Sequence, residues 1–354
     1  MRLERIEPRR PPRRELVGAV LPRDLSIAGQ RWSKGRRLAL DDLATLAADP
    51  DAVPVGRGLH VLVLEDGDVH EDAAAARLAA AVVGLGLRSR GPVQSRVDLL
   101  AAQPGVVHVR IAVLERLNRL DPLEVFTVFD GQVVDEGDLV ASVKIAPHAV
   151  DATVLERAEA LARAAGPVIA VAPFLPLRVA VVVKEPLPIA DRERFERTVR
   201  GKVEHLGSSV VAIEYVPDST AAVEAAIAAL TRGRGRGRGR AALILTAGGR
   251  STDPSDPFFL AIEALGGSVV RRGVPAHPGS MLWLARVGRT AILGLPTCGA
   301  YSKATAADLL LPRLLSGEPA SARTVARLGH GGVLTRDMRF RFPAYARELD
   351  APEG

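Results

Sequence analysis

The sequence of 354 residues contains a single cysteine, Cys298. One cysteine excludes an intrachain disulfide framework and any zinc or iron–sulfur site built from several cysteines, and it fits a reducing compartment. No stretch offers the roughly 18 uninterrupted apolar residues that a membrane-spanning helix needs. The arginine-rich start, MRLERIEPRRPPRR, lacks the apolar core of a signal peptide. We therefore expect a cytoplasmic protein with no membrane partner.

Arginine supplies most of the formal net charge of +6. Its forked guanidinium suits phosphate-bearing partners, but charge alone leaves a nucleotide, a pterin phosphate and a nucleic acid open. The run TRGRGRGRGR, residues 231–240, resembles RG segments that contact RNA. Because we expect a helix before it and a strand after it, we interpret the run as a surface loop. The run also has no aromatic residue for stacking bases, so RNA binding is only the remote alternative.

The length predicts two or three domains at about 150 residues each. Residues 1–56 are expected to form a small appended element with a helix over 40–48. Residues 57–175 are expected to form a mixed, mostly β region of barrel or sandwich type. It would hold a helix over 71–83, strands over 106–113 and 125–129, the glycine-punctuated GQVVDEGDLVASVKIAP and a helix over 151–165. Pro167, Pro173 and Pro176 place a boundary near Leu175.

Residues 176–318 alternate regularly between apolar strands and amphipathic helices. We expect strands over 178–183, 210–216, 241–245 and 268–270, helices over 191–206, 220–230, 258–265 and 302–315, and a hairpin across Gly288 and Arg289. This pattern predicts an α/β domain of three layers, a parallel sheet with helices on both faces. Ligands of such sheets bind beyond the carboxyl ends of the strands, here after Val183, Leu245 and Leu293. Residues 319–354 would form a C-terminal tail.

Three loops after these strands are shaped by glycine and proline. TAGGRSTDPSDP follows Leu245, and its paired glycines would let backbone N–H groups approach a phosphate. A tight strand-to-helix turn uses the same residues, so the glycine pair alone does not distinguish a phosphate-binding loop from such a turn. VPAHPGSM (274–281) and GLPTCGAYSKAT (294–305) add two more such turns with small hydroxyl residues.

As an ordered set, TAGGRSTDPSDP, EALGGSVV, GVPAHPGSM, ARVGRTAILGLP and DLLLPRLLSGE resemble the molybdopterin-binding domain of molybdopterin molybdotransferases and adenylyltransferases. The resemblance implies that the Gly-Gly loop and its acidic residues lie near the pterin and its metal or molybdate. It also implies that the Pro-Gly and Gly-Leu-Pro turns help to hold the substrate. GDVHEDAAAARLA, GQVVDEGDLVASVKIAP and RLGHGG are similar to the leading region of related bacterial proteins. Residues 319–354 are too few to match the carboxyl-terminal β domain of the molybdotransferase.

The resemblance selects candidate site residues. Asp253 and Asp256 are the candidate catalytic carboxylates, and Asp256 is the candidate Mg²⁺ ligand. The alternative for both is local, since Asp before Pro starts turns and either could cap the next helix. Lys303, which we expect in the first turn of a helix, is a phosphate candidate, whereas Cys298 fits a small buried hydrophobe better. The candidate cofactor-binding residues are Gly248, Gly249, Ser251, Thr252, His277, Pro278, Gly279, Ser280, Gly294, Pro296, Thr297, Ser302 and Lys303.

Three departures from the family pattern favour binding over catalysis. The glycine turn usual after the first strand is replaced by VKEPLP (183–188), Thr297 and Cys298 follow the Gly-Leu-Pro turn, and His277 stands where lysine is common. We therefore predict a protein of molybdenum cofactor biosynthesis or handling that binds molybdopterin or molybdenum cofactor, with or without Mg²⁺. The alternative is a molybdotransferase-like enzyme that inserts molybdate into adenylylated molybdopterin. The partners implied are the pterin phosphate and molybdoenzymes or other cofactor-synthesis proteins, and a homo-oligomer stays open.

Overall fold

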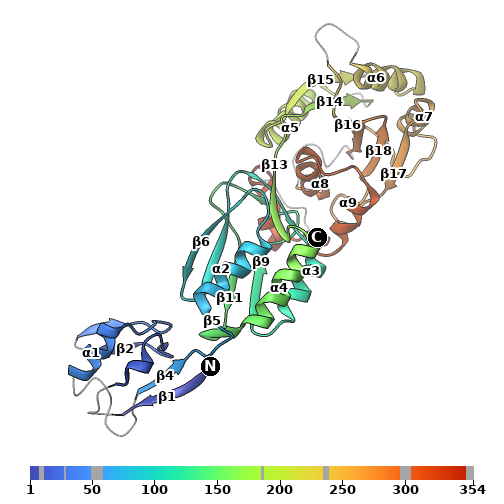
Figure 1. The fold of residues 1–354 in the computed structure, drawn as a ribbon. Helices are drawn as coiled ribbons and strands as arrows, with labels where there is room; N and C mark the ends of the chain where they lie inside the picture. The colour runs from blue at the N-terminus through green and yellow to red at the C-terminus, as the bar shows by residue number, and fades with distance from the viewer. Residues whose placement is uncertain are drawn as a thin grey trace. The chain divides into compact units, whose positions relative to one another are not determined.

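The computed structural model describes residues 1–7, 12–27, 29–48, 59–184, 187–233, 239–295 and 304–347. The chain divides into two compact units (Figure 1). One comprises residues 1–103, 108–130 and 136–171, and the other residues 104–107, 131–135 and 172–354. Within the described ranges, no helix has the length and apolar character required to cross a membrane.

The first unit begins with a small subdomain that has its own core. Its elements are β1 (Arg2–Ile6), η1 (Arg14–Leu16), β2 (Leu25–Ile27), β3 (Gln30–Trp32), α1 (Leu40–Ala48) and β4 (Leu59–Val63). β1 pairs with β4 and β2 with β3, both antiparallel. Leu21, Ile27 and Trp32 are buried together with Leu59 and Val61 of β4. The appended element expected over residues 1–56 therefore shares its core with β4.

The rest of the first unit is rich in strands. β6 (Leu87–Val93), β7 (Arg96–Ala101), β11 (Leu139–Ile145) and β9 (Leu123–Thr127) form an antiparallel sheet in that order. α2 (Glu71–Val82) packs on α4 (Ala152–Ala165) and on β11, and β5 (Asp68–His70) pairs with β12 (Ala149–Asp151). The mostly β character predicted for this region is confirmed.

One predicted strand of this region is wrong in its second half. β8 (Gly105–Val109), which pairs with β10 (Val133–Val134), ends before α3 (Ile111–Asn118) begins. Ile111, Leu114 and Leu117 recur every three residues, and Leu117 is fully buried. Residues 110–113 looked extended because a short alternating stretch and the first turn of a helix share the same apolar positions.

The second unit contains a six-stranded sheet, which follows β13 (Ile169–Pro173) in the chain. Its order is β15 (Ser209–Tyr215), β14 (Arg178–Val183), β16 (Leu243–Ala247), β19 (Thr290–Gly294), β18 (Trp283–Val287) and β17 (Ser268–Arg272). The first four strands are parallel, whereas β18 is antiparallel to both of its neighbours. The predicted parallel sheet and the hairpin through Gly288 are confirmed.

Helices cover both faces of this sheet. Val181 and Val183 of β14 face a core with α5 (Ile189–His205) and α8 (Ala306–Leu315). Ala180 and Val182 face the opposite core with α6 (Thr220–Arg232) and α7 (Pro257–Ala264). Strands that are apolar on both sides require such double coverage, so the three-layer prediction is confirmed.

The carboxyl-terminal segment belongs to the same fold. It contains α9 (Ala322–Ala326), η3 (Arg327–Gly329), η4 (Arg336–Arg341) and α10 (Ala344–Arg347). Val325, Leu328 and Phe342 are buried in the core that holds α5 and α8. Residues 319–347, expected as a tail, therefore help to complete the core of the sheet domain.

Candidate functional site

The parallel strands of the second unit end side by side. Val183 at the end of β14 pairs with Tyr215 of β15 and with Ala247 of β16, and Thr246 of β16 pairs with Gly294 of β19. The loops after all four strands therefore leave from one edge of the sheet. This is the edge at which open α/β sheets bind ligands.

The Gly-Gly loop after β16 folds as a tight connection to α7. Gly248 has φ +84°, a conformation that L side chains rarely adopt. A Cβ on Gly249 would lie 3.3 Å from the Phe258 ring, so the backbone approaches that ring closely. Ser251 is half-buried and Thr252 is exposed at the outer side of the loop.

The two aspartates of this loop both make local hydrogen bonds. Asp256 is 1% exposed and caps α7, since its Oδ1 accepts from Phe258 N at 2.9 Å and its Oδ2 from Arg250 N at 2.7 Å. Asp253 Oδ1 accepts from the Ser255 hydroxyl at 2.6 Å and from Ser255 N at 2.9 Å. These bonds, with the hydroxyl first, lower the pKa of Asp253. Both residues thus perform the turn and capping roles that the sequence offered as the alternative.

Lys184 directly follows β14, and its ammonium group links the Gly-Gly loop to the loop that follows β15. Its side chain is fully buried, and its Nζ lies 2.7 Å from Asp218 Oδ1 and 3.0 Å from Asp256 Oδ2. Arg250 donates from Nη2 to Asp218 Oδ2 at 2.8 Å. The hydrogen bond from Lys184 is the largest cause of a lowered pKa at Asp218. Two cations and two carboxylates therefore form one network across the ends of β14, β15 and β16.

Sequence reasoning assigned no role to Lys184, Asp218 or Arg250. In the sequence, Lys184 stands out only as part of a loop that lacks glycine, and Glu185 and Pro186 of that loop lie outside the described residues. A usable signal was present, because Lys184 and Asp218 each follow the carboxyl end of a predicted strand. Parallel neighbours bring such positions together at the same edge.

The Pro-Gly turn meets the amino terminus of α8. Gly279 has φ +108°, and a Cβ there would lie 2.8 Å from Ala306 N. Ala306 N donates to Pro278 O at 2.9 Å, while Ser280 is half-buried in the same turn. His277 is exposed and bonds through its backbone to Gly332 and Leu334. The turn is thus fixed between α8 and the carboxyl-terminal segment.

Trp283 connects the Gly-Gly loop to the end of β19. A Cβ on Gly294 would overlap its indole ring, and a Cβ on Gly249 would lie 3.6 Å from the indole nitrogen. Phe258 and Phe259 of α7 also contact this ring. The candidate glycines 249 and 294 are therefore brought together on one aromatic side chain.

The remaining candidates follow Leu295. Pro296, Thr297, Cys298, Ser302 and Lys303 lie outside the described residues, so their place in the site stays a prediction. The expected helix start at 302 is wrong, because α8 begins at Ala306 with Thr305 as its N-cap. Thr305 and Asp308 form a capping box, which satisfies the backbone N–H groups at that point.

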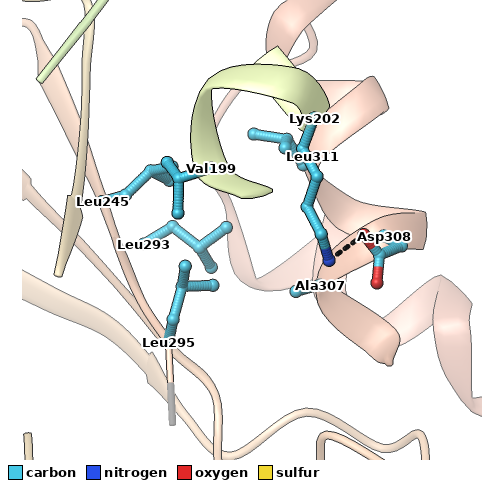
Figure 2. A pocket seen from close by; sticks show the side chains of 8 residues that line it. All are labelled: Val199, Lys202, Leu245, Leu293, Leu295, Ala307, Asp308 and Leu311. Carbon is cyan, nitrogen blue, oxygen red and sulfur yellow. Dashed lines mark hydrogen bonds and ion pairs between the residues drawn. The ribbon is translucent and has the colours of Figure 1, made fainter. Parts of the chain in front are cut away.

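A small cavity lies between α5, α8 and the ends of β16 and β19 (Figure 2). Lys202 Nζ points at Asp308 Oδ1, 2.7 Å away, and the other lining side chains are apolar. The cavity volume of about 20 Å³ suffices for about one water molecule and is too small for a pterin. Within the described ranges, no group of three or more His, Cys, Asp or Glu side chains could hold a metal ion.

Residues 184–316 match the family model described as the probable molybdopterin binding domain. The chain contains a domain of this family. The matched residues begin at Lys184 and include the Gly-Gly loop, the Pro-Gly turn and α8. The resemblance inferred from the loop motifs is thereby confirmed.

Solved structures with some likeness to the chain include two molybdopterin biosynthesis proteins. The MoeA protein from Pyrococcus horikosii is 14% identical, with 74% of this chain and 81% of that chain covered and a TM-score of 0.29. The enzyme MoaB from Thermus thermophilus is 21% identical, with 41% of this chain and 99% of that chain covered and a TM-score of 0.29. No curated protein matches the chain. At these identities and TM-scores, the likeness carries no conclusion about activity.

Proposed function

We propose that this protein binds molybdopterin, or its precursor or metal-loaded form, through the pterin phosphate at the carboxyl edge of the sheet. The observation that carries the proposal is the convergence of the Gly-Gly loop, the end of β19 and the start of α8 inside the matched domain. Closely approaching glycine backbone at a strand-to-helix turn is suited to phosphate binding. Molybdoenzymes or other cofactor-synthesis proteins, met in the cytoplasm, are the partners that such a role requires.

We further propose that the protein binds the cofactor without inserting molybdate. Metal-assisted transfer needs carboxylates that are available to a cation, and both aspartates of the Gly-Gly loop are engaged in loop and helix-cap hydrogen bonds. A positioning group misplaced by about 1 Å costs on the order of 100-fold in rate while binding survives. The geometry therefore supports storage or delivery of the cofactor better than turnover.

Two measurements test this function. Pterin retained after native purification is oxidised to its fluorescent form and identified by mass. The protein is then given adenylylated molybdopterin, Mg²⁺ and molybdate beside an authentic molybdotransferase, and AMP release and activation of an apo-molybdoenzyme are followed. We expect pterin binding with AMP release near background. Turnover comparable to that of the molybdotransferase would contradict the binding-protein proposal and support the enzyme.

A further inference from the structure

We infer that Lys184 is a built-in cation that takes the place of a divalent metal ion at the Gly-Gly loop. The ammonium group is fully buried, within 3.0 Å of carboxylate oxygens from two different loops. It also lies 5.6 Å from the centre of the Phe258 ring, on the face covered by α7. A buried lysine at the end of a strand is stable only when its charge is compensated, and here two aspartates do so.

Donors already occupy all four carboxylate oxygens of the two aspartates. Asp256 Oδ1 accepts from Phe258 N, and Asp256 Oδ2 from Arg250 N and Lys184 Nζ. Asp218 Oδ1 accepts from Lys184 Nζ and Asp218 Oδ2 from Arg250 Nη2. Mg²⁺ requires oxygen ligands at about 2.0–2.1 Å in a nearly octahedral arrangement. It would have to displace the ammonium, because the two cations cannot share these oxygens.

The charges of the network also indicate that a divalent cation would have to displace the Lys184 ammonium group. Lys184 and Arg250 balance the charges of Asp218 and Asp256, so these two carboxylates offer no excess negative charge to a further cation. Without the ammonium, two carboxylates from adjacent loops would face the space that it fills. Lys184 thus holds the ends of β14, β15 and β16 together as a metal ion would, but permanently.

The consequence for ligand binding rests on the proposed function. A phosphate held at the Gly-Gly loop would be bound without a bridging divalent cation, and Arg250, whose side chain is 61% exposed, would be the nearest cation of the network in contact with solvent. Binding of molybdopterin should then be the same in Mg²⁺ and in a chelator.

The direct test measures Mn²⁺ binding to the full-length protein by electron paramagnetic resonance, with no pterin present. We expect no specific binding by the wild type up to about 1 mM, the weak end of protein sites for hard divalent cations. Lys184→Met should bind one Mn²⁺ at least about tenfold more tightly than the wild type, and adding Asp256→Asn should abolish that gain. Lys202→Met is the matched control, because it removes another buried, paired lysine but leaves only one carboxylate, Asp308.

Two results would overturn the inference. One is stoichiometric Mn²⁺ binding by the wild type that Asp256→Asn abolishes, and the other is a folded Lys184→Met protein that binds Mn²⁺ no better than the wild type. If Lys184→Met does not fold, the comparison of wild type with Asp256→Asn decides alone. Since these titrations contain no pterin, their outcome is independent of whether molybdopterin binds.

Discussion

Single glycines set how closely the loops of the second unit approach one another. Gly279 and Gly288 both have positive φ, at +108° and +56°. Around Gly288 no atom lies within 4 Å of an added Cβ, whereas at Gly279 that Cβ would lie 2.8 Å from Ala306 N and 3.0 Å from Ala306 Cβ. Gly279 is therefore needed both for its backbone conformation and for the lack of a side chain, whereas Gly288 is needed for its backbone conformation alone.

We therefore predict that Gly279→Ala lowers the free energy of unfolding by about 2–4 kcal/mol, and Gly288→Ala by about 1 kcal/mol. Gly279→Ala should also weaken molybdopterin binding, because it moves the Pro-Gly turn away from α8. Urea denaturation of both variants measures the first effect and calorimetric titration the second. Equal destabilisation by the two substitutions would mean that the contact with α8 does not constrain this turn.

At the same scale, the sequence predicted the local hydrogen bonds of the Gly-Gly loop better than its contacts with residues far away in the chain. Asp256 was recognisable as a candidate from its loop, and its capping role was a stated alternative. Its contact with Lys184 was not foreseeable from local spacing, because the two residues follow β14 and β16, strands that become neighbours only in the folded sheet. Turns and helix caps can be predicted from local sequence. Ion pairs between the loops of a parallel sheet cannot, because they depend on the order of the strands.

Among the elements, β7 shows how one half-buried carboxylate joins three strands. Asp98 of β7 accepts from Arg90 of β6 at 2.8 Å, from Arg96 at 2.6 Å and from Ser142 of β11 at 2.7 Å. Burial raises the pKa of Asp98, but the hydrogen bonds from Arg90, Ser142 and Arg96 outweigh it and lower the pKa to about 2. The carboxylate thus stabilises the fold above its unfolded pKa near 3.8 and loses that contribution as the pH falls to about 2.

We predict that the difference in unfolding free energy between wild type and Asp98→Asn shrinks by about 1 kcal/mol from pH 5 to pH 2, a value discounted for partial exposure to solvent. Denaturation in urea at several pH values, followed by circular dichroism, measures that difference. A difference that stays constant over this range would show that the ion pairs of Asp98 do not stabilise the sheet.

Some element boundaries were predictable from the sequence, and others were not. α1 has the expected bounds, and the strands of the α/β domain were each found within a few residues. α8 starts later than expected because Thr305 and Asp308 form its capping box, a pattern hidden among several hydroxyl residues. α3 was missed because its short length gives too few apolar positions to separate period three from period two.

At the scale of the whole molecule, the RG run contributes arginines to the formal net charge of +6. Its role can be tested separately from that of the proposed ligand site. α6 ends at Arg232, Gly233 has φ +66°, and Ala241 N donates to Leu230 O at 3.0 Å. Residues 234–238 lie outside the described residues. The ends of the run are therefore fixed by α6 and by the approach to β16, as expected for a loop inside a domain.

Replacing residues 232–239 by a short Gly/Ser linker should change stability and molybdopterin affinity little, because surface connections tolerate such edits. The linker variant and the wild type are compared by thermal unfolding and by titration with the pterin. A large loss of affinity in a folded linker variant would assign the arginines to the ligand site, and a loss of RNA binding alone would revive the remote alternative.

We propose above all that the phosphate of molybdopterin binds at the carboxyl edge of the sheet. The most direct measurement is calorimetric titration of molybdopterin into the wild type, Ser251→Glu and Ser209→Glu. Ser251 lies in the Gly-Gly loop, while Ser209 is exposed at the opposite, amino-terminal edge, at the start of β15. A new carboxylate beside the phosphate should weaken binding at least about tenfold, or about 1.4 kcal/mol, at Ser251 and leave it unchanged at Ser209. Unchanged affinity in a folded Ser251→Glu protein, or an equal loss in both variants, would contradict the account.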